Sequence, residues 1–212
     1  MKLTVFHAAD GDCLLLASRG RRPRYLLVDG GRKDSYGKHT RDVLGRLRAA
    51  GRKLDVVCVS HIDDDHISGI RQLVEDEVEW RAFEFRSTIQ PGTRAPRVLR
   101  PPVIGEVWHN GLFKLIGDDI GVVVEPVLST MATMLAGSPR SELRAVASEL
   151  DNLAHGEASS MELTRRLSDR QLMIPLNPRT GGALVKRATT GARAAGEHVT
   201  LGSLEIFLLG PS

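Results

Sequence analysis

Residues 60–66 read Ser-His-Ile-Asp-Asp-Asp-His and place two imidazoles and three carboxylates within six consecutive positions. They directly follow residues 54–59, an apolar run with the composition of a buried strand. Rigid elements that end in ligand side chains are a common way to hold metal ions, and His with Asp suits Zn²⁺ or Mn²⁺. An ordinary acidic turn uses the same residue types, but it does not need two histidines around three aspartates. We therefore predict a divalent-metal site in residues 60–66, called the His-Asp segment below.

The elements around the His-Asp segment follow from apolar spacing and turn residues. Two antiparallel strands are predicted at residues 2–7 and 13–18, and a third at residues 24–29, where Gly30 and Gly31 allow a tight turn. A helix is predicted over residues 40–50 before the strand at 54–59, and a short helix over residues 67–74 after the His-Asp segment. The order strand, helix, strand, loop, helix is typical of a sheet covered by helices.

The His-Asp segment resembles the signature of the metallo-β-lactamase superfamily, His-x-His-x-Asp-His after a hydrophobic strand. His61, Asp65 and His66 take the first, third and fourth ligand positions, and Asp63 stands where the family has its second His. Residues 6–16 are similar to the first hairpin of that family. The pattern is most similar to the branch that includes the nuclease-like domain of bacterial DNA-uptake (competence) proteins.

The resemblance implies an α/β fold of the αββα sandwich type, with the N-terminal half and its metal loop in residues 1–125. Residues 126–176 have helical apolar spacing and are expected to form a helical insertion, in which Ser159 or Ser160 caps a second helix. Residues 177–212 are expected to return to the sheet through an exposed loop at 186–198 and a strand at 204–209.

The resemblance also implies roles for individual residues. His61 and Asp63 would serve one metal ion, and Asp65 with His66 would serve another or share it. Asp65 is the candidate catalytic residue. Outside the ligand set, Asp29 is expected to hold the loop by hydrogen bonds. The remaining candidates are second-shell groups or possible ligands, namely Asp64 and His109, the latter at the end of a strand predicted over residues 103–109.

Arginines gather in clusters although the formal net charge is only +3. Such clusters favour polyanions, because neutralised phosphates release counterions, and they are also common on ordinary protein surfaces. We take a nucleic acid as the expected substrate. The candidate nucleic-acid-binding residues are Arg21, Arg22, Arg24, Arg165 and Arg166.

Composition places the chain among ordinary globular proteins, with 42% hydrophobic and 26% charged residues in a chain of 212. Neither a signal segment nor a membrane-spanning run is recognisable, so a cytoplasmic location and no membrane partner are expected. Cys13 and Cys58 lie in predicted strands and are expected to be reduced core residues. The apolar run 204–209 near the last residue is expected to pair with a further C-terminal segment or partner chain that completes the fold.

Three functions remain open at this point. A metal-dependent phosphodiesterase, most simply a nuclease on DNA or RNA, agrees with the metal ligands and the arginines, and it would be inactive without its C-terminal part. A catalytically incomplete module could instead serve as a protein-interaction or regulatory subunit. Hydrolysis of a small ester, thioester or lactam is a narrower third alternative.

Overall fold

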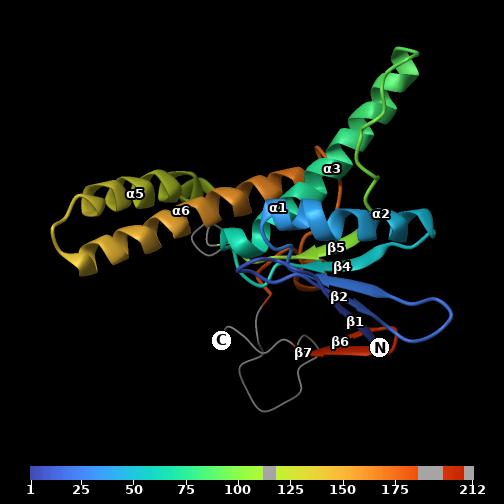
Figure 1. Ribbon diagram of the computed structural model, residues 1–212, viewed down its shortest axis with the longest axis horizontal. Helices are drawn as coiled ribbons and strands as arrows, with labels where there is room; N and C mark the ends of the chain where they lie inside the picture. The colour runs from blue at the N-terminus through green and yellow to red at the C-terminus, as the bar shows by residue number, and fades with distance from the viewer. Residues whose placement is uncertain (112–117, 186–197, 208–212) are drawn as a thin grey trace.

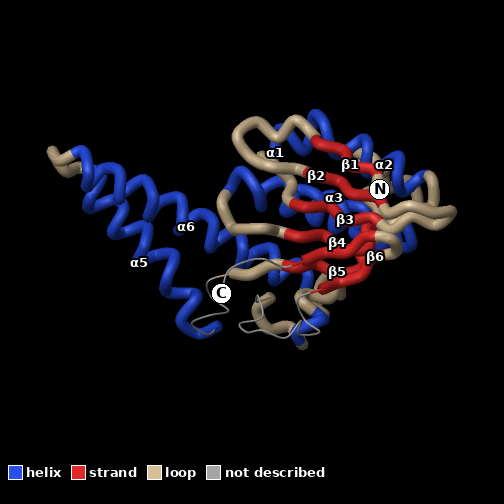
Figure 2. The backbone as a smooth tube through the Cα atoms, turned by 90° about the horizontal axis from the view of Figure 1, so that it is seen from below, coloured by secondary structure: helices blue, strands red, loops and turns tan. Residues whose placement is uncertain are grey.

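The core of the fold is a five-stranded sheet in the order β1-β2-β3-β4-β5. The computed structural model describes residues 1–111, 118–185 and 198–207. In this sheet β1–β2–β3 is antiparallel, and β4 and β5 continue it in parallel. Figure 2 shows the five strands side by side, with the helices behind them. The strands are β1 (Lys2–Val5), β2 (Leu14–Ala17), β3 (Tyr25–Val28), β4 (Leu54–Cys58) and β5 (Ile104–Trp108).

The two faces of the sheet bury different partners because side chains alternate along each strand. On one face Leu27 and Val57 pack with Leu44, Ile70 and neighbouring apolar residues of the helices. Figure 1 shows these helices above the sheet. They are α1 (Lys33–Ser35), the π-helical turn η1 (Tyr36–Thr40), α2 (Arg41–Ala49) and α3 (Asp64–Ile89).

A two-stranded sheet covers part of the other face. It consists of β6 (His198–Leu201) and β7 (Leu204–Phe207). Val199 and Leu204 pack there against Val56 of the main sheet, so apolar residues lie on both sides of β4. The five-stranded sheet with helices is the mixed α/β architecture expected from the sequence.

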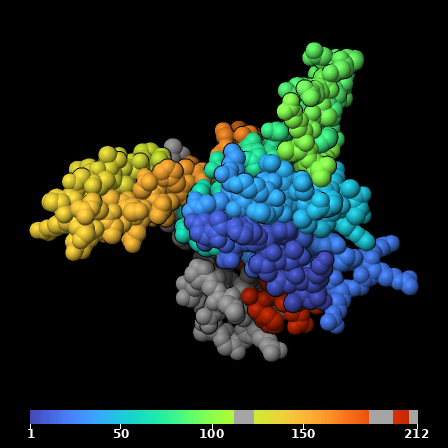
Figure 3. Space-filling view, in the orientation of Figure 1, coloured from blue at the N-terminus to red at the C-terminus, as the bar shows by residue number. Residues whose placement is uncertain are grey.

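A long helical hairpin extends away from the sheet in Figures 1 and 3. It consists of α5 (Asp118–Ala136), which begins before residue 126, and α6 (Ser141–Leu167). The prediction that Ser159 or Ser160 caps a separate helix is wrong, because both lie buried inside α6. Each makes a long-range hydrogen bond from there, Ser159 with Arg71 and Ser160 with His109.

The helix after the His-Asp segment is also longer than predicted. We expected a short helix over residues 67–74, but α3 runs for 26 residues to Ile89. Its distal half is held by the Pro-rich segment that follows: the Trp80 indole donates to the carbonyl of Val98, and Arg100 pairs with Glu77 and Glu84. These contacts join distant positions, and local spacing does not reveal them.

The segment between α6 and β6 contains a short helical turn next to β5. The 3₁₀ turn η2 spans Pro178–Thr180, and the preceding segment bridges β5 through Val107 and Leu176. Most of the loop expected at 186–198, and the last two residues of the strand expected at 204–209, lie outside the described residues. Among the residues described, no helix combines the length and apolar character needed to cross a bilayer.

The two thiols are free and are expected to be unreactive in the folded protein. Burial raises the pKa of Cys13 to about 11 and that of Cys58 to about 12. Because the thiolate is the nucleophile, iodoacetamide at pH 8 should label the native protein far more slowly than the protein in denaturant, as measured by mass spectrometry. Between the ordinary thiol pKa of 9.0 and these raised values, the thiols lose protons in the unfolded chain but keep them in the folded protein. The free energy of unfolding is therefore expected to fall as the pH rises above about 9. Labelling that is equally fast in both states would contradict the burial of Cys13 and the partial burial of Cys58.

Candidate active site at the carboxyl end of strand β4

The His-Asp segment lies where β4 ends and α3 begins, beside the turn after β3. The parallel pairing of β3 and β4 brings Val28 opposite Cys58, so Asp29 and Ser60 emerge at the same sheet edge. The main chain of this region is tightly packed: the Gly30 N–H donates to the carbonyl of His66 over 2.9 Å, and the Gly69 N–H to that of Gly31 over 2.9 Å. A side chain at Gly30 or Gly69 would collide with the facing backbone, so α3 approaches this turn only because both are glycine.

Asp29 positions both histidines, His66 directly and His61 through Ser60. Its carboxylate accepts hydrogen bonds from the Ser60 N–H over 2.7 Å and from the Ser60 hydroxyl over 2.6 Å. It also lies 3.1 Å from Nδ1 of His66. Asp29 is 2% exposed and has a φ of 57°, an uncommon conformation for a residue other than glycine. A buried carboxylate in such a conformation is held there by its hydrogen bonds.

These hydrogen bonds fix which imidazole nitrogen carries the proton. A carboxylate only accepts, so Nδ1 of His66 donates to Asp29. The Ser60 hydroxyl gives its proton to Asp29 and therefore accepts from Nδ1 of His61, 2.9 Å away. The neutral form of each histidine consequently carries its lone pair on Nε2, the atom that a metal ion would use.

Each of these Nε2 atoms faces a carboxylate. Nε2 of His66 lies 3.4 Å from Asp65, and Nε2 of His61 lies 3.6 Å from Asp63. The two rings are close, with centroids 3.7 Å apart. An imidazole lone pair that faces a carboxylate oxygen is unfavourable unless a proton or a cation lies nearby. The nitrogen and oxygen ligands and their orientation therefore fit a divalent cation. The fit is partial, since no group of three or more His, Cys, Asp or Glu side chains in the described part of the chain is close enough to hold an ion.

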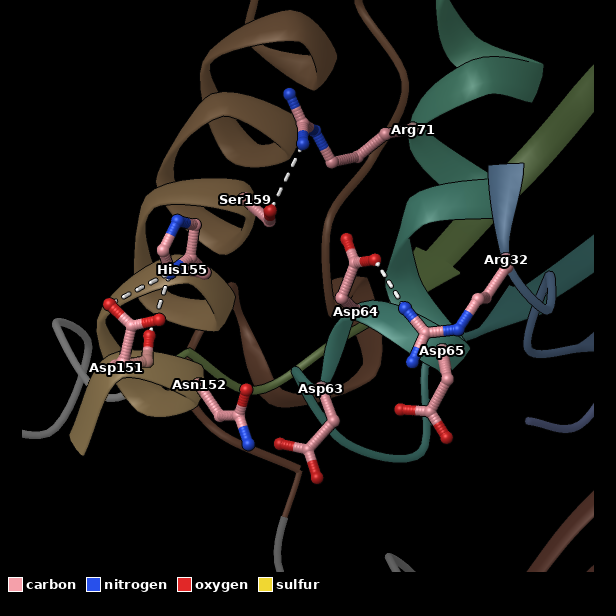
Figure 4. A pocket seen from close by; sticks show the side chains of 9 residues that line it. All are labelled: Arg32, Asp63, Asp64, Asp65, Arg71, Asp151, Asn152, His155 and Ser159. Carbon is pink, nitrogen blue, oxygen red and sulfur yellow. Dashed lines mark hydrogen bonds and ion pairs between the residues drawn. The ribbon is translucent and has the colours of Figure 1, made fainter. Parts of the chain in front are cut away.

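A cleft of about 440 Å³ opens beside the His-Asp segment, between the start of α3 and the helix α6 (Figure 4). Asp63, Asp64 and Asp65 line one side of it. The other side is formed by α6. Arg32 and Arg71 complete the lining, which also includes Asp151, Asn152, His155 and Ser159. The place of His155 in the cleft depends on the packing of a helix some ninety residues downstream of the His-Asp segment, so local sequence patterns do not reveal it.

Both guanidinium groups in the cleft are engaged with carboxylates. Arg32 donates to Asp10 over 2.6 and 2.7 Å and to Asp64 over 3.1 Å. The hydrogen bond from Arg32 lowers the pKa of Asp10 and raises the pKa of Arg32 itself. Arg71 pairs with Glu162 and donates to Ser159 over 3.0 Å. With four lining carboxylates against two arginines, the cleft carries excess negative charge.

His109 is used differently. It follows β5 directly, is 2% exposed, and its Nε2 lies 3.0 Å from the Ser160 hydroxyl of α6. Its main chain is clamped by Asn177, whose side-chain amide exchanges two hydrogen bonds with the His109 N–H and carbonyl. His109 therefore joins β5 to α6 and does not line the cleft.

The arginines chosen from the sequence lie elsewhere. Arg21, Arg22 and Arg24 belong to the turn between β2 and β3, which is at the edge of the sheet opposite the His-Asp segment. Arg24 pairs with Asp55 over 2.7 Å. Arg165 and Arg166 lie in the last turn of α6, and Arg166 pairs with Glu75 over 2.7 Å. Neither group lines the cleft.

One family model, described as the metallo-beta-lactamase superfamily, matches residues 11–132, more than half of the 212 residues. The matched region contains Asp29 and the whole His-Asp segment. No curated protein and no solved structure matches the chain.

Asp29 should matter for both stability and metal affinity. Replacing Asp29 by Ala leaves the Ser60 and His66 donors without their acceptor, which should cost about 1–3 kcal/mol of unfolding free energy and weaken divalent-metal binding by about 10–100-fold. Urea unfolding and competition with a chelating dye measure the two effects. Asp55→Asn is the matched control: Asp55 is also buried and bonded, to Arg24 and Tyr25, but at the far edge of the sheet. Loss of stability without loss of metal affinity in both variants would contradict the role given to Asp29.

Gly156 should control how closely α6 approaches the His-Asp segment. A Cβ at this position would lie 2.6 Å from the carbonyl oxygen of Ile62, so Gly156→Ala must push α6 or the segment away. We expect a loss of about 1–3 kcal/mol in unfolding free energy, measured by urea titration. Gly137→Ala, where an added Cβ meets nothing within 4 Å, should be close to neutral. Equal stability of the two variants would show that α6 does not rest on the segment.

Proposed function

The chain belongs to the metallo-beta-lactamase superfamily, and from this premise we propose that it is a metal-dependent hydrolase of phosphodiesters. Members of this superfamily are mostly metal-dependent hydrolases and usually bind divalent ions, often Zn²⁺. The observation that carries the proposal is the pair of imidazoles whose Nε2 atoms face Asp63 and Asp65 beside the cleft.

The residues that would hold the ion are His61, Asp63, Asp65 and His66. A bound divalent ion supplies Lewis acidity and lowers the pKa of coordinated water, which provides a nucleophile at neutral pH. Asp29 and Ser60 keep both Nε2 lone pairs directed away from the protein core through the Nδ1 hydrogen bonds. Zn²⁺ and Mn²⁺ both suit this mixed nitrogen and oxygen set.

The charge of the cleft supports the requirement for a cation. Four carboxylates against two arginines repel an anionic substrate in the metal-free protein. Divalent charge at the His-Asp segment would reverse that balance. Arg32, on the side of the cleft next to α3, would then face the phosphodiester. Anion binding to this cleft is therefore expected to depend on the metal.

A nuclease acting on long DNA or RNA is the finer form of this proposal. It is supported by the resemblance of the His-Asp segment to nuclease-like members of the superfamily. It receives less support from the arginines, because Arg21 and Arg22 lie at the opposite edge of the sheet and Arg166 is held by Glu75. The cleft itself favours a phosphodiester with few additional charges.

A second candidate is a non-catalytic interaction module, and one observation favours it. The α5 helix exposes an apolar row at helical spacing, made of Val123, Val127, Met131 and Met134. Such rows are typical of protein contacts. This alternative needs no bound metal, so measured metal content separates the two candidates.

We expect His66→Ala to abolish hydrolysis and to lower the metal content per chain, because it removes a buried imidazole ligand that Asp29 holds in place. The assays are elemental analysis after loading with Zn²⁺ or Mn²⁺ and turnover of a chromogenic phosphodiester. His39→Ala, an exposed histidine that does not line the cleft, serves as the control and should behave as wild type. A wild-type protein that carries no metal after incubation with Zn²⁺ or Mn²⁺ would contradict the proposal. Turnover of a lactam or thioester, but of no phosphodiester, would favour the alternative of small-ester, thioester or lactam hydrolysis.

A further inference from the structure

The face of α6 that lines the cleft is assigned no role by the superfamily match, although it forms one side of the cleft. Asp151, Asn152, His155 and Ser159 recur at positions i, i+1, i+4 and i+8 of the helix, a spacing that places them on one side. Figure 4 shows them on α6, across the cleft from Asp63 and Asp64. Three of them, Asp151, Asn152 and His155, are exposed and so can contact a molecule in the cleft.

This wall is held firmly against the His-Asp segment. Gly156 packs so closely on the carbonyl of Ile62 that no side chain fits between them. About one turn further along the helix, Ser159 accepts from Arg71 over 3.0 Å and Ser160 bonds His109 over 3.0 Å. Further along the helix, Arg166 pairs with Glu75 of α3. Because these contacts fix α6, the distance across the cleft is set by the fold and the wall can select substrates by size.

The chemistry of the wall favours uncharged polar groups. His155 donates from Nδ1 to the carbonyl oxygen of Asp151 over 2.8 Å, and since a carbonyl only accepts, neutral His155 presents Nε2 as an acceptor. The Asn152 amide both donates and accepts. The one charge on this face is the carboxylate of Asp151. The nearest cation in the lining, Arg71, is already paired with Glu162, so a second phosphate would find repulsion here.

We propose that this α6 face is a specificity wall, with Asn152 and His155 as hydrogen-bonding partners for an uncharged hydroxyl or amide group of the substrate. The inference rests on the proposed phosphodiesterase activity and narrows its substrate class. The substrate is a compact phosphodiester with one anionic group next to the His-Asp segment and a neutral polar remainder against α6. A volume of about 440 Å³ suits such a molecule, whereas a polynucleotide would place further phosphates beside Asp151.

The test compares three probes with the metal-loaded full chain. They are thymidine 5′-p-nitrophenyl phosphate, the same compound with a 3′-phosphate, and a single-stranded oligodeoxynucleotide. The wild type should prefer the first over the second by about tenfold or more in kcat/KM. Asn152→Ala combined with His155→Ala should lower kcat/KM for the first probe by about tenfold, mainly through KM, as expected for two lost hydrogen bonds.

A variant with an added positive charge tests the proposal by a gain of activity on the doubly phosphorylated probe, which a damaged protein cannot show. Asn152→Lys should improve kcat/KM for the 3′-phosphorylated probe relative to the first probe by about tenfold, because it places a cation where the second phosphate lies. Ala145→Lys adds the same charge at an exposed position of α6 outside the cleft, and should leave the ratio unchanged. Thermal unfolding of each variant checks that the fold is intact.

The outcomes separate the two proposals. Hydrolysis by the wild type with probe ratios that neither the alanine pair nor Asn152→Lys changes would overturn the specificity wall and leave the phosphodiesterase proposal standing. A wild type that prefers the oligodeoxynucleotide would also overturn it, in favour of a nuclease. Failure to cleave any of the three probes with Zn²⁺ or Mn²⁺ would overturn the phosphodiesterase proposal, and the wall that rests on it.

Discussion

The buried carboxylate of Asp29 is the constraint on which the rest of the site depends. It lies directly after β3, is 2% exposed, and receives hydrogen bonds from Ser60 and His66. Burying an ionised carboxylate is expensive unless its oxygens are well paired, so Ser60 and His66 cannot move independently of it. Through the Ser60 hydroxyl the same carboxylate also determines the tautomer of His61. One side chain thus ties together two strand ends and two imidazoles.

Close backbone contacts extend this constraint outward. Gly30 and Gly69 let the first turns of α3 lie directly on the turn after β3, which places Asp64 and Asp65 at the rim of the cleft. Gly156 does the same for α6 against Ile62. Because main-chain atoms meet at these points, the width of the cleft is set by packing between rigid elements. The side chains that line the cleft are not constrained in this way.

The balance of charge in the cleft connects this architecture to chemistry. Its arginines are neutralised by neighbouring carboxylates, Arg32 by Asp10 and Asp64 and Arg71 by Glu162. The excess negative charge is therefore concentrated on the aspartates that face the His61 and His66 nitrogens. A site of this kind attracts cations first and anions only afterwards. This order of binding is what a metal-dependent hydrolase requires.

The sequence by itself determined the central part of this fold. Alternating apolar residues and the glycines after Asp29 predict β1 to β4, and the position of the His-Asp segment after an apolar run predicts that it lies at a sheet edge. These features are local, because strand alternation and turn residues depend on neighbours in the chain. The metal-ligand roles of His61, Asp63, Asp65 and His66 stay predictions, since donor geometry alone does not establish an ion.

Only the tertiary structure decided what surrounds the His-Asp segment. The length of α3 depends on Arg100 and Val98 from the following loop, and the continuity of α6 through Ser159 and Ser160 depends on Arg71 and His109. The cleft exists because α6 returns to Ile62, and the arginine turn between β2 and β3 is remote because strand direction places it at the other edge of the sheet. Each of these outcomes is set by contacts between residues far apart in the chain, for which neither periodicity nor composition carries a signal.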